Sequence, residues 1–227
     1  MKKNNQFIFV LFIISMQHGI YLIKNSDSFA FLKGVEISHD YIYHNIQTLI
    51  WFLPIYFILN YFSGTISQLL HGYGILLVTR NYDKRKLYLH QLLKMIAQLF
   101  IFTFYQIGLN YFIPISRINI SNHLIIMFLI YCLFLITIII IQSCMELYIQ
   151  PEISNLIVVL NILTHIIIFN IAAKHFHHWQ YILIGNYPLG YRLGNGLYKV
   201  EVIIMILNII AMISIIFAIK KIKQMDL

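Results

Sequence analysis

Basic and turn-forming residues gather in one short segment between two strongly apolar stretches of the chain. The segment consists of Arg80, Asn81, Tyr82, Asp83, Lys84, Arg85 and Lys86. Asn and Asp are residue types that cap helices or form turns, and apolar residues recur at helical spacing from Leu89 onward. A cluster of cations suits docking to an acidic surface or to anionic lipid. The pattern predicts two short helices about a turn that lead into a longer helix; a basic loop that only fixes membrane orientation is the alternative.

Polar side chains also occur inside the apolar stretches, where they are expensive in lipid and indicate either a pathway or contacts between helices. The candidates are Gln17, His18, Asn60, Gln106, Asn110, Glu146, Asn161 and His165. Uncharged amides commonly form hydrogen bonds between helices. Glu146 differs because it is ionisable, and it would either meet Lys94 or Arg80 or reach water.

Motifs for metal binding and catalysis are weak or absent. The run His175-x-His177-His178-Trp179 offers imidazoles that suit zinc, copper or nickel, but no carboxylate or cysteine lies nearby in the sequence to complete a site. The chain contains no His-Glu-x-x-His pattern and no phosphate-binding loop of the Gly-x-x-x-x-Gly-Lys-Ser/Thr type. The sequence therefore predicts no metal, no cofactor bound by this chain and no enzyme activity of its own.

The elements that carry these residues are long apolar runs. The chain is 60% hydrophobic and 11% charged, far more apolar than an ordinary soluble domain. Runs of about 20 apolar residues are long enough to cross a bilayer as helices. The predicted spans are approximately 7–23, 46–62, 92–113, 124–141, 153–173 and 200–219, within a single domain of residues 1–227. The fold class is an all-α integral membrane protein of about six transmembrane helices; five or seven spans remain open because the first two are short and contain polar residues.

The distribution of Lys and Arg predicts the orientation. With the N-terminus inside, ten basic residues face the cytoplasm: Lys2, Lys3, Arg80, Lys84, Arg85, Lys86, Lys94, Lys220, Lys221 and Lys223. Six face outward: Lys24, Lys33, Arg117, Lys174, Arg192 and Lys199. Both termini are therefore expected in the cytoplasm, and the net charge of +8 indicates contact with lipid and cytosolic partners, not nucleic acid. Aromatic residues at span ends are interpreted as interfacial anchors: Tyr21, Trp51, Tyr111, Trp179, Tyr181 and Tyr198.

A family resemblance rests on two segments. Residues 72–88 combine Gly72-x-Gly74, an aliphatic run, Thr79-Arg80, a polar turn and then Lys84-Arg85-Lys86 before a helix. This pattern resembles permease subunits of type-2 ATP-binding-cassette exporters, of the small six-span kind found with bacteriocin or lantibiotic export and immunity. Residues 185–190, Gly-Asn-Tyr-Pro-Leu-Gly, look like the outward re-entrant hairpin that these permeases have before the last span. The family's amphipathic helix ahead of the first span has no counterpart in the few residues before Phe7.

The resemblance implies a function and a set of partners. Residues 80–86 would be the coupling element that docks on a cytosolic ATP-binding-cassette ATPase, which would bind ATP and Mg. A second permease copy or a sister permease would complete the transporter in the bacterial cell membrane. The cargo would be an amphipathic peptide or a lipid-like compound. Two alternatives stay open: a membrane immunity or binding protein that acts without ATP, and the substrate-binding subunit of a small-solute uptake system.

Overall fold

The computed structural model describes residues 3–24, 29–35, 41–71, 83–113, 122–175, 179–194 and 199–224. These residues are helical or in turns, with no strand among them. The helices are α1 (Lys3–Ile23), α2 (Ala30–Lys33), α3 (Tyr41–Phe62), α4 (Thr65–His71), α6 (Lys84–Phe112), α7 (Asn122–Met145), α8 (Pro151–His175), η1 (Trp179–Ile182), η2 (Ile184–Asn186), α9 (Gly190–Gly194) and α10 (Val200–Gln224). Six stretches are long and apolar enough to cross a membrane, which indicates a multi-pass membrane protein.

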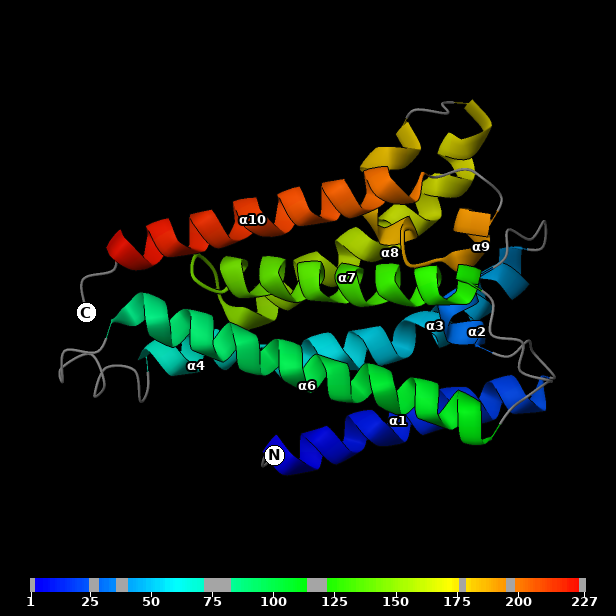
Figure 1. Ribbon diagram of the computed structural model, residues 1–227, viewed down its shortest axis with the longest axis horizontal. Coiled ribbons are helices and arrows are strands. Elements are labelled where there is room, and N and C mark those ends of the chain that lie inside the picture. Colours follow the sequence, from blue (N-terminus) through cyan, green and yellow to red (C-terminus); the bar gives the residue numbers. More distant parts are fainter. Residues whose placement is uncertain are drawn as a thin grey trace.

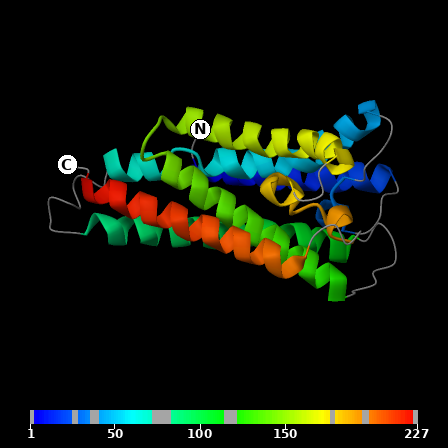
Figure 2. The same ribbon diagram turned by 90° about the horizontal axis from the view of Figure 1, so that it is seen from above.

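Helix α7 occupies the centre of the bundle (Figure 1). It packs against α10, α6, α8 and α3, whereas α1 packs against α3 and α6. Figure 2 shows the long helices running roughly along one direction. At one end lie α4, the start of α6, the turn between α7 and α8, and the last turn of α10 (Figure 1). We call this the basic end because it carries Lys84, Arg85, Lys86, Lys220, Lys221 and Lys223. Helices α2 and α9 lie at the opposite end (Figure 1).

The predicted spans match six apolar helices, and two boundaries differ more than the others. The second apolar stretch runs over Ile46–Leu70, since α3 is followed by α4 after a break at Ser63 and Gly64. The third helix begins at Lys84, well before the predicted residue 92. Asp83 caps this helix, because its side chain accepts a hydrogen bond from the Arg85 N–H at 2.9 Å. The capping prediction is confirmed for Asp83, whereas Arg80, Asn81 and Tyr82 lie outside the described residues.

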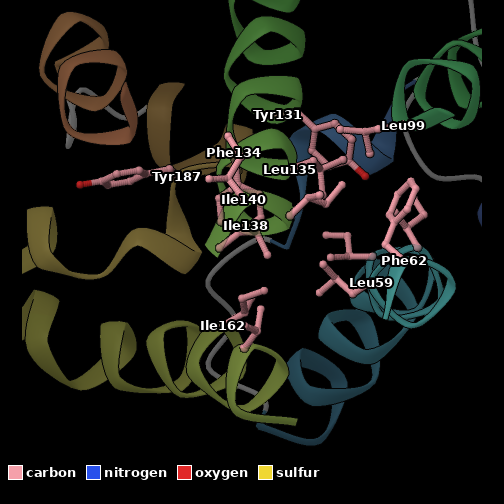
Figure 3. Packing of buried hydrophobic residues seen from close by; sticks show 14 of the residues in the cluster. Leu59, Phe62, Leu99, Tyr131, Phe134, Leu135, Ile138, Ile140, Ile162 and Tyr187 are labelled. Carbon is pink, nitrogen blue, oxygen red and sulfur yellow. The ribbon is translucent and has the colours of Figure 1, made fainter. Parts of the chain in front are cut away.

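The core lies between α3, α6, α7 and α8. Figure 3 shows Leu59, Leu135, Ile138 and Ile162 pointing toward one another from three of these helices. All four side chains are at most 4% exposed. Burial of such side chains excludes both water and lipid from the centre of the bundle, so the polar groups placed there must find partners within the protein.

The segment between the first and second predicted spans contains a buried piece. Phe29 adopts a left-handed conformation with φ of 59° and leads into the short helix α2. Phe29, Phe31 and Leu32 are each at most 4% exposed. The Trp51 indole N–H donates to the Phe31 carbonyl at 2.8 Å. Trp51 is itself 2% exposed, so its prediction as an interfacial anchor is wrong: its indole N–H is satisfied inside the protein, not at the lipid surface.

Candidate functional site

Glu146 joins the end of α7 to the start of α4 at the basic end. Its Oε1 accepts a hydrogen bond from the Gly64 N–H at 2.9 Å, and its Oε2 accepts one from the Ile66 N–H at 3.3 Å. The first N–H groups of a helix have no acceptor within the helix and favour a negative charge. Glu146 therefore acts as an N-terminal cap for α4 although it lies in a distant segment, the turn that follows α7. We call Ser63, Gly64, Ile66, Glu146 and Pro151 the junction.

The junction buries its carboxyl group. Glu146 is 6% exposed, and this burial raises its pKa to about 7, while the N–H groups that it accepts from act in the opposite direction. Lys94, one of the expected partners, is exposed, and the contacts of Glu146 in the described part of the chain are with backbone N–H groups of the α4 start. Arg80, the other expected partner, lies outside the described residues. The alternative, that Glu146 reaches water, does not agree with its burial, since the residue is only 6% exposed.

Further hydrogen bonds tie the neighbouring helices together close to the junction. Ser63 Oγ donates to the Pro151 carbonyl at 3.2 Å. The Gln142 amide donates to the Leu59 carbonyl at 3.1 Å, and Tyr88 Oη lies 3.1 Å from Ser143 Oγ. These contacts connect α3, α6, α7 and the start of α8. A displacement of α4 at the junction would therefore disturb contacts that involve four long helices.

The basic residues at the start of α6 point outward beside the junction. Arg85 and Lys86 are exposed and Lys84 is half-buried. Arg85 Nε lies 3.7 Å from Asp83 Oδ1, with both side chains more than 40% exposed. Exposed pairs of this kind contribute little to stability. Arg85 and Lys86 are therefore available to a partner, as the docking prediction requires.

A second set of hydrogen-bonded polar residues lies in the middle of the bundle. The Gln17 amide donates to the Ile50 carbonyl at 3.1 Å and to the Trp51 carbonyl at 3.2 Å. Pro54 lies inside α3 and has no N–H, so the carbonyl four residues before it, that of Ile50, loses its helical donor. Gln17 supplies that donor from α1, as expected for a proline in a membrane helix.

The same set of hydrogen-bonded residues continues into α6 and α7. Gln106 Nε2 donates to Gln17 Oε1 at 3.4 Å, and Tyr131 Oη donates to Gln106 Oε1 at 3.4 Å. Asn110 Oδ1 accepts from the Phe29 N–H at 3.2 Å and so supports the left-handed turn there. The structure thus brings Gln17, Gln106 and Asn110 together in hydrogen bonds that join helices.

The remaining predicted residues are spread over the bundle. His18 Nε2 lies 2.9 Å from the Ile113 carbonyl at the end of α6, which calls for a proton on Nε2. His165 Nδ1 accepts from the Gly185 N–H at 3.3 Å, and its carbonyl accepts from the Asn186 amide at 2.9 Å. Asn161 is exposed on α8. His177 and His178 of the histidine run lie outside the described residues.

Asn60 lines a cleft that the sequence did not reveal. The cleft has a volume of about 470 Å³ and lies between α1, α3 and α8. Besides Tyr56, its lining includes the polar residues Gln6, Asn60, Ser63, Glu152 and Asn155. Only Asn60 was a candidate from the sequence. The other four lie in the first turns of α1 and α8 or in the break after α3, where polar residues are ordinarily solvated, so their types alone gave no signal.

Comparison with known proteins gives a family. Residues 7–227 match the sequence model of the family described as "Protein of unknown function (DUF2705)". The chain is 31% identical over 225 residues to "Uncharacterized protein YybK" of Bacillus subtilis (strain 168), covering 90% of this chain and 88% of that protein. No solved structure matches the chain.

Proposed function

The chain belongs to the DUF2705 family, and we propose that it is the membrane-spanning permease subunit of an ATP-driven exporter whose ATP is hydrolysed by a separate subunit. The observation that carries the proposal is the junction, where buried Glu146 joins α4 to the end of α7. Helix α4 and the basic start of α6 would form the coupling element of the resembled permeases. The cargo would be an amphipathic peptide or a lipid-like compound.

Docking would use the exposed cations at the start of α6. Arg85 and Lys86 are exposed beside the junction, and an acidic surface on a cytosolic ATPase would complement them. Electrostatic complementarity of this kind speeds encounter and fixes the register of two surfaces. Asp83 supports the presentation of these cations because it holds the first turn of α6 in place.

A conformational change in the docked ATPase would be transmitted from α4 to α7. Glu146 is bonded to the start of α4, and Ser63 is bonded to Pro151 at the start of α8. Helix α7 packs against α10, α6, α8 and α3, so a movement of its end would change most of the packing in the bundle. Nucleotide in the partner ATPase must favour one packing over the other for such switching to occur.

The charge distribution supports a cytoplasmic basic end. Among the described residues, this end carries Lys3, Lys84, Arg85, Lys86, Lys94, Lys220, Lys221 and Lys223. Cytoplasmic loops and span ends of membrane proteins carry an excess of Lys and Arg. We therefore place both termini in the cytoplasm of a bacterial cell and α2 and α9 on the outer side.

The outer side would include a re-entrant hairpin made by η1, η2 and α9. Tyr187 and Leu189 are 0% exposed, and η2 packs closely on α8. The Tyr187 hydroxyl donates to the Tyr181 carbonyl, so the turn is closed by its own side chain. Non-helical backbone at membrane depth is tolerated where protein buries it, and this packing supports that reading.

The test is affinity purification of the tagged protein in mild detergent, followed by identification of the chains that co-purify. We expect an ATPase in stoichiometric amount, and we expect it to be lost when Lys84, Arg85 and Lys86 are changed to Gln. The matched control changes Lys220, Lys221 and Lys223 to Gln, which removes the same charge from the same end. Retention of the ATPase in the control variant would separate specific docking from loss of net charge.

The opposite result would favour another function. If the protein purifies alone while a candidate ATPase is present in the same cells, the coupling role of the junction is overturned. A membrane immunity or binding protein that acts without ATP would then account for the fold better.

A further inference from the structure

We propose that the cleft between α1, α3 and α8 binds the ammonium headgroup of a phospholipid of the ethanolamine type. The cleft holds about 470 Å³, within the range of small-molecule sites. Its side chains come from three long helices, which gives it a fixed frame. The inference concerns binding by this chain alone, and it stands or falls without an ATPase partner.

A buried acceptor points to a ligand in the cleft. Asn155 is 8% exposed, and its Oδ1 accepts no hydrogen bond from the part of the chain that the structure describes. A buried polar atom left without a partner is unfavourable, and such atoms in native proteins normally meet water or a ligand. Asn155 lines the cleft while its Oδ1 is itself buried, so a turn of the side chain brings this oxygen to a ligand that donates a hydrogen bond.

The other polar groups select a positively charged donor. Glu152 contributes a carboxylate, and Asn60 contributes an amide with an acceptor oxygen. Ser63 already donates its hydroxyl proton to the Pro151 carbonyl, so its oxygen is left to accept. Acceptors around one carboxylate fit the three N–H donors of a primary ammonium group. A quaternary ammonium has the same charge but no N–H donor, and it would leave the Asn155 oxygen unmet.

An adjoining hollow provides room for an apolar chain. It has a volume of about 210 Å³, shares Gln6 and Asn60 with the cleft, and is otherwise lined by Phe9, Val10, Phe57 and Tyr61. Phe9 on one side and Leu156 on the other are 40% and 56% exposed, so the cleft is flanked by surface suited to lipid. A polar cleft with an apolar extension matches an amphiphile that enters from the bilayer.

Position and charge favour a phospholipid over a free amine. Gln6 and Glu152 lie in the opening turns of α1 and α8, near the ends of their spans where headgroups reside. Lys3 Nζ lies 5.6 Å from the centroid of the Tyr61 ring, and Tyr61 lines the adjoining hollow. A cation on that side complements the phosphate of a zwitterionic headgroup, while Glu152 and Asn155 take its ammonium.

The experiment is native mass spectrometry of the detergent-purified protein after incubation with equal amounts of phosphatidylethanolamine, phosphatidylcholine and phosphatidylglycerol of the same acyl chains. We expect phosphatidylethanolamine to be retained about tenfold over phosphatidylcholine, since only its primary ammonium donates charge-assisted hydrogen bonds. Glu152→Gln and Asn155→Leu should each reduce this retention about tenfold. Glu201→Gln, which removes an exposed carboxylate at the start of α10, is the matched control and should retain the lipid as the unchanged protein does.

Four results would overturn the proposal, one of them from a separate incubation with dodecylammonium. Equal retention of phosphatidylethanolamine and phosphatidylcholine would show that N–H donors are not recognised, and preference for phosphatidylglycerol would indicate an anion site. Retention of dodecylammonium without phosphatidylethanolamine would exclude the phospholipid as occupant. If Asn155→Leu does not fold, the exposed substitutions Glu152→Gln and Asn60→Ala decide the matter, and unchanged retention in both would refute the site.

Discussion

The side-chain amide of Gln17 donates to the backbone carbonyl of Ile50, the group that Pro54 deprives of its helical donor. Helix α1 thus supplies the donor that the Ile50 carbonyl lacks within α3, and Gln17 and Pro54 lie far apart in the sequence. In lipid no water can serve as the substitute. We therefore expect Gln17 to stabilise the protein more than an average amide between membrane helices does.

Replacing Gln17 by Leu should destabilise the protein by about 1–3 kcal/mol, because the Ile50 carbonyl would be left buried without a partner. The measurement is the thermal unfolding midpoint in detergent. Pro54→Ala restores an N–H within α3, so the double variant Gln17→Leu/Pro54→Ala should lose much less than Gln17→Leu alone. Asn208→Leu is the control, since among the described residues Asn208 donates to the Ile204 carbonyl of its own helix and to no other helix. Equal losses with and without Pro54 would contradict the repair.

The pKa of Glu146 predicts a dependence of stability on pH. Burial raises this pKa from 4.5 to about 7, so between these values the folded protein binds a proton more tightly than the unfolded chain. The stability gained from this difference is fully present below the unfolded value and is lost as the pH rises through about 7. The full effect is on the order of 3 kcal/mol.

Thermal unfolding midpoints measured from pH 5 to pH 9 test this dependence. We expect a fall across neutral pH in the unchanged protein and a flatter profile in Glu146→Gln, whose amide cannot ionise. Glu201→Gln, which changes an exposed carboxylate, should follow the unchanged protein. A Glu146→Gln profile as steep as that of the unchanged protein would assign the titration to another group.

Because Asp83 caps α6, we expect its substitution to reduce docking of the proposed ATPase more than it reduces the stability of the protein. Asp83→Ala removes the side-chain acceptor for the Arg85 N–H and should cost about 1 kcal/mol. The first turn of α6 would fray, so we expect co-purification of the partner ATPase to fall more than the unfolding midpoint does. Asp83→Asn keeps a capping side chain and should preserve both. If ATPase recovery is unchanged in Asp83→Ala, the order of this turn does not matter for docking.

Apolar length and the Asp83 cap could be predicted from the sequence because both depend on local residue types. The six apolar helices follow from runs that cross a bilayer. The predicted end of the second span at residue 62 coincides with the end of α3. The short helix α4 beyond Ser63 and Gly64 was left out of that span, since four of its seven residues are polar: Thr65, Ser67, Gln68 and His71. Residues 29–35 lie outside the predicted spans, because a hydrophobic piece this short is too short to cross a bilayer and has charged neighbours in the sequence.

The partners of the polar residues could not be predicted, because they depend on packing between distant segments. Glu146 meets the start of α4, and this requires the turn after α7 to lie beside the end of α3. The cleft depends on Asn155 of α8 facing α3 across a space that no spacing rule encodes. Residue type identified Gln17 and Asn110 as candidates, but only the fold distinguishes a contact between helices from a pathway.

Gly185 in η2 and Gly108 in α6 allow a matched prediction about the packing of η2 against α8. A Cβ added to Gly185 would lie 2.8 Å from the Ile162 carbonyl oxygen and 2.9 Å from His165 Cβ, whereas one added to Gly108 meets nothing within 4 Å. Gly185→Ala must therefore push η2 away from α8 and weaken the bonds of Gly185 and Asn186 to His165. We expect it to cost about 1–3 kcal/mol, while Gly108→Ala, inside α6, should be neutral or stabilising by about 0.5–1 kcal/mol. Thermal unfolding of the two variants in detergent decides; equal midpoints would mean that η2 is not held against α8.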